Sequence, residues 1–334
     1  MTLALHDPQS GFYATREAIG AGGHFITAPE ISQIFGEFLG LWCAQVWQVQ
    51  GRPAKPRLVE LGPGRGVLMR DALRALRGIH DFLEGLELLF VEASPEFEQI
   101  QRKSLVDQKI SMRWVRHWSD IDQDRPLFLL ANEFLDALPI RQFVMTERGW
   151  CERVVTESGD ALSFALAPIP TPLVVPAERG TAAQGAVLEV SQASESLVED
   201  IGRTIATQGG GALFIDYGHA SQGFGDTLQA VARHKHADIL SAPGEADISA
   251  HVDFAALSES AQRGGARVWG PIGQGDFLHA MGIETRMRKL ATANPTQSSD
   301  IEEAVARLTN PEDMGSLFKV LAVMPPNAPT PPGF

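Results

Sequence analysis

The stretch from Arg57 to Asp71 constrains the fold more than any other part of this sequence. It opens with an apolar run, turns through glycines, and continues with apolar residues at helical spacing, namely Val67, Leu68, Ala72, Leu73 and Leu76. That order predicts a buried parallel strand, a tight turn and an amphipathic helix. Glycine permits a positive φ and leaves the backbone bare for a ligand, and the following helix points its first N–H groups at the same place.

Two classes of cofactor use a strand, a glycine turn and a helix in this way. The dinucleotide fingerprint G-x-G-x-x-G needs a glycine at position 67, where this chain has Val67. The observed pattern is an acid followed by three alternate glycines, Glu60-x-Gly62-x-Gly64-x-Gly66, which is typical of S-adenosylmethionine (SAM) methyltransferases. We therefore expect Glu60 and the three glycines to bind SAM, and a nicotinamide-dependent oxidoreductase is disfavoured.

Composition and charge narrow the classes of partner. The 334 residues carry a formal net charge of −13, which disfavours nucleic acid and suits a small molecule or a basic protein. Cys43 and Cys151 lack metal-ligand spacing, so we expect two reduced, partly buried thiols, and His234 and His236 lack further ligands for a metal. There is no apolar run of 18 residues and no signal-like N-terminus. We expect no membrane insertion, and a cytoplasmic location in a bacterium or a mitochondrial matrix location in a eukaryote.

Two further strands place polar side chains where a nucleoside would lie. The apolar run 86–91 leads into Glu92, whose carboxylate could accept from both ribose hydroxyls. The alternative is an ordinary surface acid at a strand end. Ser94 is expected to cap the helix that follows. After a third strand at 112–115, Asp120 could accept from the adenine amino group or could cap a helix.

The strongest catalytic candidates follow a fourth strand, the apolar run 126–131. Asn132, Glu133 and Asp136 come directly after it. Ligands of open α/β sheets bind beyond the carboxyl ends of the strands, so these side chains are expected to reach the reacting groups. For each of them the alternative is that it caps the next turn.

The N-terminal region is expected to cover the cofactor. Thr27-Ala-Pro-Glu30 reads as a capping box, with Pro29 in the first turn of a helix from about 28 to 49. Glycines at 20, 22 and 23 mark a loop ahead of it. A helix that only covers the core would explain the apolar face but not this loop, for which a ligand lid is the hypothesis. Thr27 and Pro29 are expected to contact the cofactor from this side.

The remaining sequence alternates strands with helices, which indicates βαβ units, an α/β fold and a mostly parallel sheet. Residues 140–190 differ, because aromatic and β-branched residues with turn signals predict β-hairpins and a Pro-rich loop in an inserted cap. Beyond the cap we expect helices at 191–208, 254–263 and 275–282, and strands at 212–215, 227–231, 266–269 and 317–323. The expected regions are an N-terminal lid and helix (1–52), the first half of the SAM-binding core (53–139), the cap (140–190), the second half of the core (191–324) and a Pro-rich tail, extended or frayed (325–334).

Several segments together resemble the MidA family of class I SAM-dependent methyltransferases. They are 25–36 (FITAPEISQIFG), 59–66 (VELGPGRG), 131–139 (ANEFLDALP), 214–218 (FIDYG), 247–254 (DISAHVDF) and 314–322 (MGSLFKVLA). The resemblance implies a Rossmann-like core with a seven-stranded sheet. For the mitochondrial members it implies methylation of an arginine in a complex I core subunit and help with assembly of that complex. The chain departs from the family at His24, where the family usually has Asp, and family members tend to carry further N-terminal helical sequence.

The sequence thus predicts a SAM-dependent methyltransferase that modifies an arginine of a protein, with a complex I core subunit as the target that the resemblance implies. Glu133 and Asp136 would orient the guanidinium and disperse its charge, and Asn132 would bridge cofactor and substrate. His251 is a further candidate, as acceptor of the released proton. The competing hypothesis is a SAM-binding assembly factor that acts by binding partners and needs none of Glu133, Asp136 and His251. A homodimer is compatible with either hypothesis.

Overall fold

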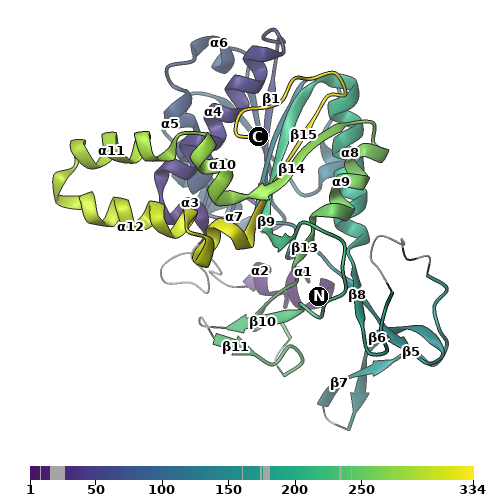
Figure 1. Ribbon diagram of the computed structural model, residues 1–334. Coiled ribbons are helices and arrows are strands. Elements are labelled where there is room, and N and C mark those ends of the chain that lie inside the picture. Colours follow the sequence, from purple (N-terminus) through teal and green to yellow (C-terminus); the bar gives the residue numbers. More distant parts are fainter. Residues whose placement is uncertain are drawn as a thin grey trace.

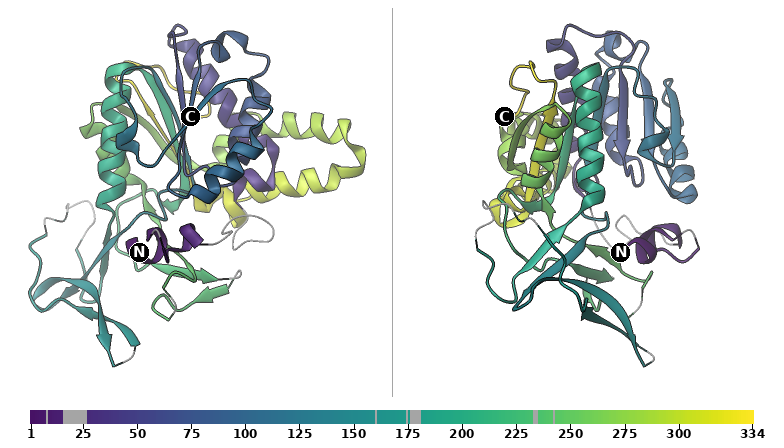
Figure 2. Two further views of the ribbon diagram at one scale, coloured as in Figure 1. Left: turned by 180° about the vertical axis from the view of Figure 1, so that it is seen from behind. Right: turned by 90° about the vertical axis from the view of Figure 1, so that its right-hand side faces the viewer.

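The computed structural model describes residues 1–7, 9–15, 27–159, 161–173, 175, 181–232, 235–241 and 243–334 (Figures 1 and 2). The loop at 20–23, for which a lid was considered, lies outside the described residues. So do His24, the departure from the family pattern, and His234.

A large mixed sheet forms the centre of the fold, with strand order β14-β15-β9-β4-β1-β2-β3. The bounds are β1 (Arg57–Leu61), β2 (Glu87–Val91), β3 (Ser111–Val115), β4 (Leu127–Asn132), β9 (Gly210–His219), β14 (Arg267–Gly273) and β15 (Phe318–Met324). Strands β1, β2, β3, β4 and β9 are parallel to one another, whereas β15 is antiparallel to both β9 and β14. The predicted seven-stranded sheet is confirmed, and a two-residue strand, β13 (Val252–Asp253), pairs with β9 in addition.

Helices cover both faces of this sheet. Successive side chains of a strand point to opposite faces, so that Leu58 of β1 packs in one hydrophobic core and Val59 in the other. The first core contains α4 (Gln33–Val49), α5 (Val67–Leu76) and α10 (Gln274–Ala280), and the second contains α8 (Gln192–Gln208) and α9 (Phe254–Arg263). These two groups of helices lie on opposite sides of the sheet in Figure 1. Because the five strands β1, β2, β3, β4 and β9 are parallel, their carboxyl ends meet at one open edge, where the candidate site residues lie.

The helix predicted for 28–49 is divided at Ser32. This residue is extended and its hydroxyl accepts from the Ile34 N–H, which ends α3 (Ala28–Ile31) and caps α4. The predicted capping box is wrong, because Thr27 precedes α3 but its side chain makes no capping hydrogen bond. Glu30 lies instead opposite Arg65 of the glycine turn.

Two smaller sheets stand beside the open edge. The hairpins predicted in the cap are confirmed: β5 (Arg141–Thr146), β6 (Gly149–Ser158), β7 (Ala161–Leu166) and β8 (Val187–Val190) form an antiparallel sheet that projects from the core in Figure 1. The other sheet contains β10 (Gln229–Ala232), β11 (Lys235–Ala237) and β12 (Asp247–Ser249). It packs against the N-terminal α1 (Thr2–His6) and α2 (Phe12–Thr15), with Leu5, Phe12 and Ile248 in a shared core.

The remaining helices include one pair that the sequence analysis did not predict. α6 (His80–Leu83) and α7 (Pro95–Ser104) follow the glycine-turn helix, and Ser94 caps α7 as expected. The unpredicted pair, α11 (Ile283–Ala293) and α12 (Ser298–Thr309), extends away from the body in Figure 1. Cys43 and Cys151 are both free and buried, as expected. Within the described residues, none of the helices has the length and apolar character needed to cross a membrane.

The C-terminal tail packs against the body of the protein and contains turns at residues 326–327 and 332–333, so the expectation that it is extended or frayed is wrong. The Trp42 Nε1–H donates to the carbonyl of Pro332 at 3.1 Å, and the Phe334 ring packs on that of Phe277 with centroids 5.6 Å apart. Ala328 is also buried in the first core. The segment has five prolines, and these contacts fix it against α4 and α10.

Deletion of residues 325–334 should therefore destabilise the whole fold. Trp42 is fully buried and would lose its hydrogen-bond acceptor, and the apolar contacts of Phe277 would be exposed. We expect the free energy of unfolding to fall by roughly 2 to 4 kcal/mol. Urea unfolding of the truncated chain and of a Phe334→Ala control, which should lose less, measures this, and an unchanged midpoint for the truncation would show that the tail is not part of the core.

Candidate active site

The glycine turn after β1 has the geometry that its sequence predicts. Gly62, Gly64 and Gly66 all have left-handed backbone conformations, with φ of 60°, 51° and 74°, and Gly66 is the N-cap of α5. A Cβ built on Gly62 would lie 2.7 Å from Cδ2 of Phe134. The backbone conformation therefore disfavours a side chain at each of the three glycines, and at Gly62 lack of space excludes one as well.

A pocket opens over this turn and brings most of the predicted cofactor residues together. We call it the glycine-turn pocket. It is lined by Thr27, Pro29, Glu30, Glu60, Gly62, Pro63, Gly64, Arg65, Val67, Leu68, Asn132 and Glu133. Seven of these residues were predicted from the sequence, and Glu30 and Arg65 are charged residues that were not.

Unused hydrogen-bond acceptors in this pocket suit a ligand with several donors. Glu60 is buried, and its Oε2 has no hydrogen-bond partner, and the same is true of Asn132 Oδ1. Burial, and then the charge of Glu92, raise the pKa of Glu60. Because buried polar atoms without partners cost free energy, such acceptors are expected where a ligand completes the site. SAM offers an ammonium group and ribose hydroxyls as donors, so the residues present fit it.

Glu92, the predicted ribose acid, lies at the carboxyl end of β2 and is held in place by its neighbours. It accepts from the Ser94 N–H at 2.8 Å and from Gln101 Nε2 at 2.9 Å, while burial raises its pKa. The Gln101 amide also donates to the Gly64 carbonyl at 2.7 Å and accepts from Trp114 Nε1. Gln101 thus joins the glycine turn to Glu92. The sequence did not reveal this, because its only sign is one polar residue on the buried face of α7.

Asp120, the other nucleoside candidate, caps a short 3₁₀ helix at Trp118–Asp120. Its carboxylate accepts from the His117 N–H at 2.9 Å, and the residue is exposed. The alternative left open from the sequence was an N-cap role, but the N-cap is His117, and Asp120 is the third residue of the helix and bonds back to it. It is not among the described residues that line the glycine-turn pocket, and a contact with adenine stays a prediction.

The turn after β4 holds Glu133 in a strained conformation beside the glycine-turn pocket. Its φ is 50°, which is rare outside glycine. Its Oε1 accepts from the Ala28 N–H and from Asn132 Nδ2, both at 3.0 Å. Burial raises the pKa of Glu133 to about 7, and the Asp136 charge adds to this shift. The α3 backbone and the β4 turn therefore meet on this one carboxylate.

Asp216, three residues before the end of β9, fixes this turn. One carboxylate oxygen accepts from the N–H groups of Phe134, Leu135 and Asp136 at 3.0 to 3.2 Å, and the other accepts from the Tyr217 N–H. Burial and the neighbouring Asp136 charge raise its pKa, and the N–H donors of Asp136 and Tyr217 oppose that shift. The sequence around Asp216 gives no sign of this role, because the three turn residues that donate to it lie 80 to 82 residues away in the chain.

Two more carboxylates complete a group of four beyond the sheet edge, which we call the acid cluster: Glu133, Asp136, Asp216 and Asp247. The chain has two tyrosines, and each donates to one member, Tyr217 to Asp136 and Tyr13 to Asp247 at 2.9 Å. Burial raises the pKa of Asp136 to about 6 and that of Asp247 to about 7, the Asp136 charge contributing to the latter. Among the described residues, no ion pair with Lys or Arg reaches any of the four.

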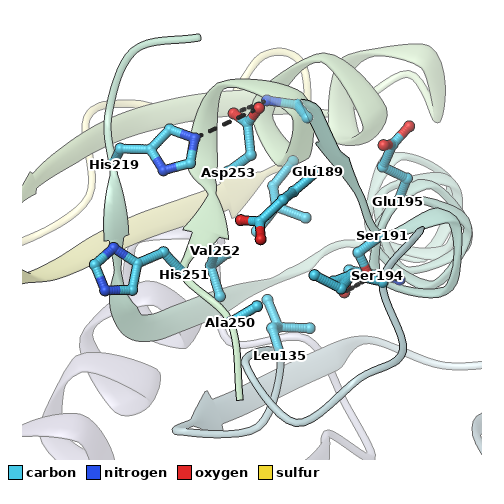
Figure 3. Close-up of a pocket in the computed structure, with 13 residues that line it drawn as sticks. Leu135, Glu189, Ser191, Ser194, Glu195, His219, Ala250, His251, Val252 and Asp253 are labelled. Atoms are coloured by element: carbon cyan, nitrogen blue, oxygen red, sulfur yellow. Dashed lines mark hydrogen bonds and ion pairs between the residues drawn. The ribbon is translucent and has the colours of Figure 1, made fainter. Parts of the chain in front are cut away.

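His251 lies on the far side of the β4 turn, in a second pocket shown in Figure 3. Its ring meets the Tyr217 ring edge-on with centroids 5.6 Å apart, and Tyr217 in turn bonds Asp136. His219 and Asp253 line the same pocket, with 3.7 Å between the imidazole and the carboxylate. Burial, and then His219, lower the pKa of His251, which favours its neutral form. His251 therefore contacts the acid cluster through Tyr217.

No group of three or more His, Cys, Asp or Glu side chains in the described part of the chain has an arrangement that could hold a metal ion. The carboxylates of the acid cluster are bonded to backbone N–H groups, amides and tyrosines, as described above.

Comparison with known proteins gives consistent matches over nearly the whole chain. A family model described as "putative S-adenosyl-L-methionine-dependent methyltransferase" matches residues 38–272. Proteins named "Protein arginine methyltransferase NDUFAF7, mitochondrial" are similar: the one from Danio rerio is 36% identical over 97% of this chain and 82% of its own length, and that from Homo sapiens is 35% identical over 97% and 79%. A crystal structure of a COG1565 superfamily member from Burkholderia thailandensis, bound to S-adenosyl-homocysteine, has a TM-score of 0.85 and 29% identity, covering 99% of this chain and 88% of that one.

Proposed function

The chain belongs to the family of S-adenosyl-L-methionine-dependent methyltransferases, and we propose that its methyl acceptor is an arginine side chain of a protein. The cofactor is SAM. The observation that carries the choice of acceptor is the acid cluster, because four carboxylates stand together without a cationic partner in the described structure. The names of the related proteins support the same acceptor.

A guanidinium group matches the acid cluster in charge and in hydrogen bonding. It carries a delocalised positive charge and five N–H donors in a plane, which suits carboxylates that bind in a bidentate manner. Burial raises the pKa values of all four carboxylates, and repulsion from Asp136 adds to the shift for Glu133, Asp216 and Asp247. A bound cation would relieve that repulsion. The net charge of −13 would attract a basic segment of a protein as well.

The residues of the β4 turn have distinct parts in the proposed reaction. SAM, when bound, supplies a methyl group on a sulfonium centre, which a nitrogen nucleophile can attack directly. Glu133 lines the glycine-turn pocket and Asp136 lies on the side of Tyr217, so together they would hold the guanidinium between cofactor and acid cluster. Correct placement alone can supply about 7 to 11 kcal/mol of the barrier reduction. Asn132, with its unpaired Oδ1, would orient cofactor and acceptor together.

Glu133 is better placed than His251 to accept the proton that the guanidinium releases. It lies on the pocket itself and has a pKa of about 7, close to the value that general-base catalysis favours at neutral pH. His251 contacts the cluster through the ring of Tyr217. We propose that the Glu133 carboxylate accepts the proton released by the guanidinium, and that His251 acts only after Glu133.

This assignment predicts the pH dependence of the enzyme. A carboxyl group with a raised pKa is ionised only above that pKa, so activity should rise as the pH increases through about 7. Between pH 6 and pH 8 we expect kcat/KM to increase about tenfold. Initial rates across this range measure the profile, with S-adenosylhomocysteine affinity recorded in parallel as the control. A flat profile between pH 6 and pH 8 would rule out Glu133 as the base.

A respiratory complex I core subunit is the specific acceptor that we propose, on the resemblance described above. If the chain is eukaryotic the reaction would take place in the mitochondrial matrix, and if it is bacterial in the cytoplasm. The competing function is a SAM-binding assembly factor without essential catalysis, which shares the cofactor pocket and needs none of the acid cluster.

Labelled SAM separates these two functions. The protein is incubated with methyl-labelled SAM and a lysate from cells that lack it, and labelled proteins are resolved on a gel. We expect one labelled band, identified as a complex I subunit by mass spectrometry. If the purified protein binds S-adenosylhomocysteine normally but no protein in the lysate is labelled, the assembly factor is favoured.

A further inference from the structure

The cap sheet ends in an edge strand that lacks the usual protection against pairing. In the order β7-β6-β5-β8, β7 is the last strand, and within the described residues it pairs with β6 alone. Natural edge strands commonly carry a lysine, a proline or a bulge that blocks the addition of a further strand. Residues 161–166 (ALSFAL) contain no charged residue and no proline, and their register with β6 is continuous. This edge can therefore accept another strand.

Three residues of β7, which we call the edge residues, direct their main-chain groups away from β6: Leu162, Phe164 and Leu166. The evidence is the next residue, Ala167, whose N–H donates to the Glu152 carbonyl of β6 at 2.8 Å. In an antiparallel pair, alternate residues bond to the same neighbour, so residues 163 and 165 also face β6. The N–H and C=O groups of the edge residues therefore point to the open side, where the described part of the chain places no strand.

The edge residues also form an exposed apolar strip. The side chains of Leu162, Phe164 and Leu166 are 39%, 41% and 41% exposed. Directly opposite residues of paired strands share a face, so Val155, which is opposite Phe164 and 52% exposed, belongs to the same strip. Trp150 of the cap core is five residues from Val155 on β6 and so lies on the other face. Because this hairpin projects from the body in Figures 1 and 2, another molecule can reach the strip.

We propose that β7 pairs with β7 of a second copy of this chain, antiparallel and about a two-fold axis at Phe164. The apolar residues are placed symmetrically about this position. The axis therefore puts Phe164 opposite its own counterpart and Leu162 opposite Leu166 of the second copy. Each of these pairs would exchange both of its main-chain hydrogen bonds, and the two apolar strips would join into one.

The charges beside the strip favour a second copy as the occupant. Arg153 on β6 lies opposite Leu166, and Glu157 lies opposite Leu162. In the two-fold arrangement, Arg153 of one copy therefore shares a row of side chains with Glu157 of the other, so that each row ends in opposite charges. The paired strands are short, so we expect a weak dimer with a Kd of about 1 to 100 µM. This inference does not depend on which acceptor is methylated.

Sedimentation velocity of the full chain at concentrations spanning this range tests the dimer. Phe164→Glu would place two like charges directly opposite each other, and we expect the Kd of dimerisation to rise at least about tenfold. Val154→Glu adds the same charge on the other face of the hairpin, where Val154 is 38% exposed, and should leave this Kd within about twofold of the wild type. The affinity for S-adenosylhomocysteine, unchanged in both variants, shows that the fold is intact.

Single cysteines test the register. Under mild oxidation Phe164→Cys should form a disulfide with its own counterpart, because opposite Cα atoms would be about 5.5 Å apart, within the range that a disulfide spans. Leu162→Cys alone should not, since the two copies of residue 162 would lie about 14 Å apart, but an equal mixture with Leu166→Cys should. The native Cys43 and Cys151 are buried and should contribute little.

Three results would overturn the proposal. The first is a wild type that stays monomeric over the whole range, with no disulfide in Phe164→Cys. If Phe164→Glu then also reduced methylation of the acceptor protein, the edge would bind that protein instead. The second is a disulfide in Leu162→Cys alone, which would mean a different register. The third is equal weakening of the dimer by Val154→Glu and Phe164→Glu, which would place the contact on neither face of the hairpin in particular.

Discussion

Glu133→Gln should reduce methyl transfer by at least about a thousandfold while leaving S-adenosylhomocysteine affinity within about threefold of the wild type. The amide has nearly the same shape and keeps an oxygen that can accept from the Ala28 N–H, so the contact between α3 and the β4 turn survives. What is lost is the negative charge that would orient the guanidinium and the carboxylate that would take its proton. The effect should therefore fall on kcat.

The measurement pairs single-turnover rates with calorimetric binding for the same sample. Glu96→Gln, at an exposed acid on α7, controls for the loss of one negative charge elsewhere on the molecule. Unchanged turnover in Glu133→Gln would remove Glu133 from the mechanism. A parallel loss of cofactor binding would make it a cofactor ligand instead.

Asp216→Asn should have the second-largest effect, on stability and turnover together. The Asp216 carboxylate accepts four backbone N–H groups, three of them from residues 134–136, and it is only 1% exposed. An asparagine has one oxygen, so at least one donor would face an NH₂ group inside the fold. We expect the free energy of unfolding to fall by roughly 2 to 4 kcal/mol.

The same change should displace Asp136 and reduce turnover about a hundredfold, because the turn that carries the catalytic candidates is no longer fixed. Urea unfolding and kcat are measured on the variant and on Asp226→Asn. Asp226 also accepts from side chains, Arg153 and Gln142, but it is 47% exposed. Stability within about 0.5 kcal/mol of the wild type, with normal turnover, would show that Asp216 does not hold the turn.

The cofactor half of the site could be predicted because its signals are local in sequence. A strand, three alternate glycines and a helix lie within residues 57–76, and each element follows from its own spacing of apolar residues. Glu92 and Asn132 could be added because the carboxyl ends of parallel strands share one edge. The pocket that brings Glu60, Gly62 and Asn132 together follows from those rules.

The acid cluster could be predicted only in part, because tertiary contacts assemble it. Glu133 and Asp136 follow a recognisable strand, but Tyr13 and Asp247 are 234 residues apart and no local pattern links them. Asp216 acts on the backbone of a distant turn, which leaves no sign in the sequence around it. The role of Gln101 was missed for the same reason.

Two wrong predictions have a similar origin. Thr27-Ala-Pro-Glu30 has the residue types of a capping box, yet Ser32 starts α4 and Glu30 lies opposite Arg65. The tail has the composition of a frayed segment, but Trp42 and Phe277 provide partners that only the folded structure brings near. In both cases a local propensity was overridden by a contact from elsewhere in the chain.

The identity of the methylated residue tests the central claim most directly. The labelled acceptor protein from the SAM incubation is hydrolysed to amino acids, and the labelled amino acid is identified by chromatography and mass spectrometry. An acid cluster that binds a guanidinium predicts that the label is recovered as methylated arginine. Recovery of the label in lysine, histidine or a carboxylate ester would contradict it.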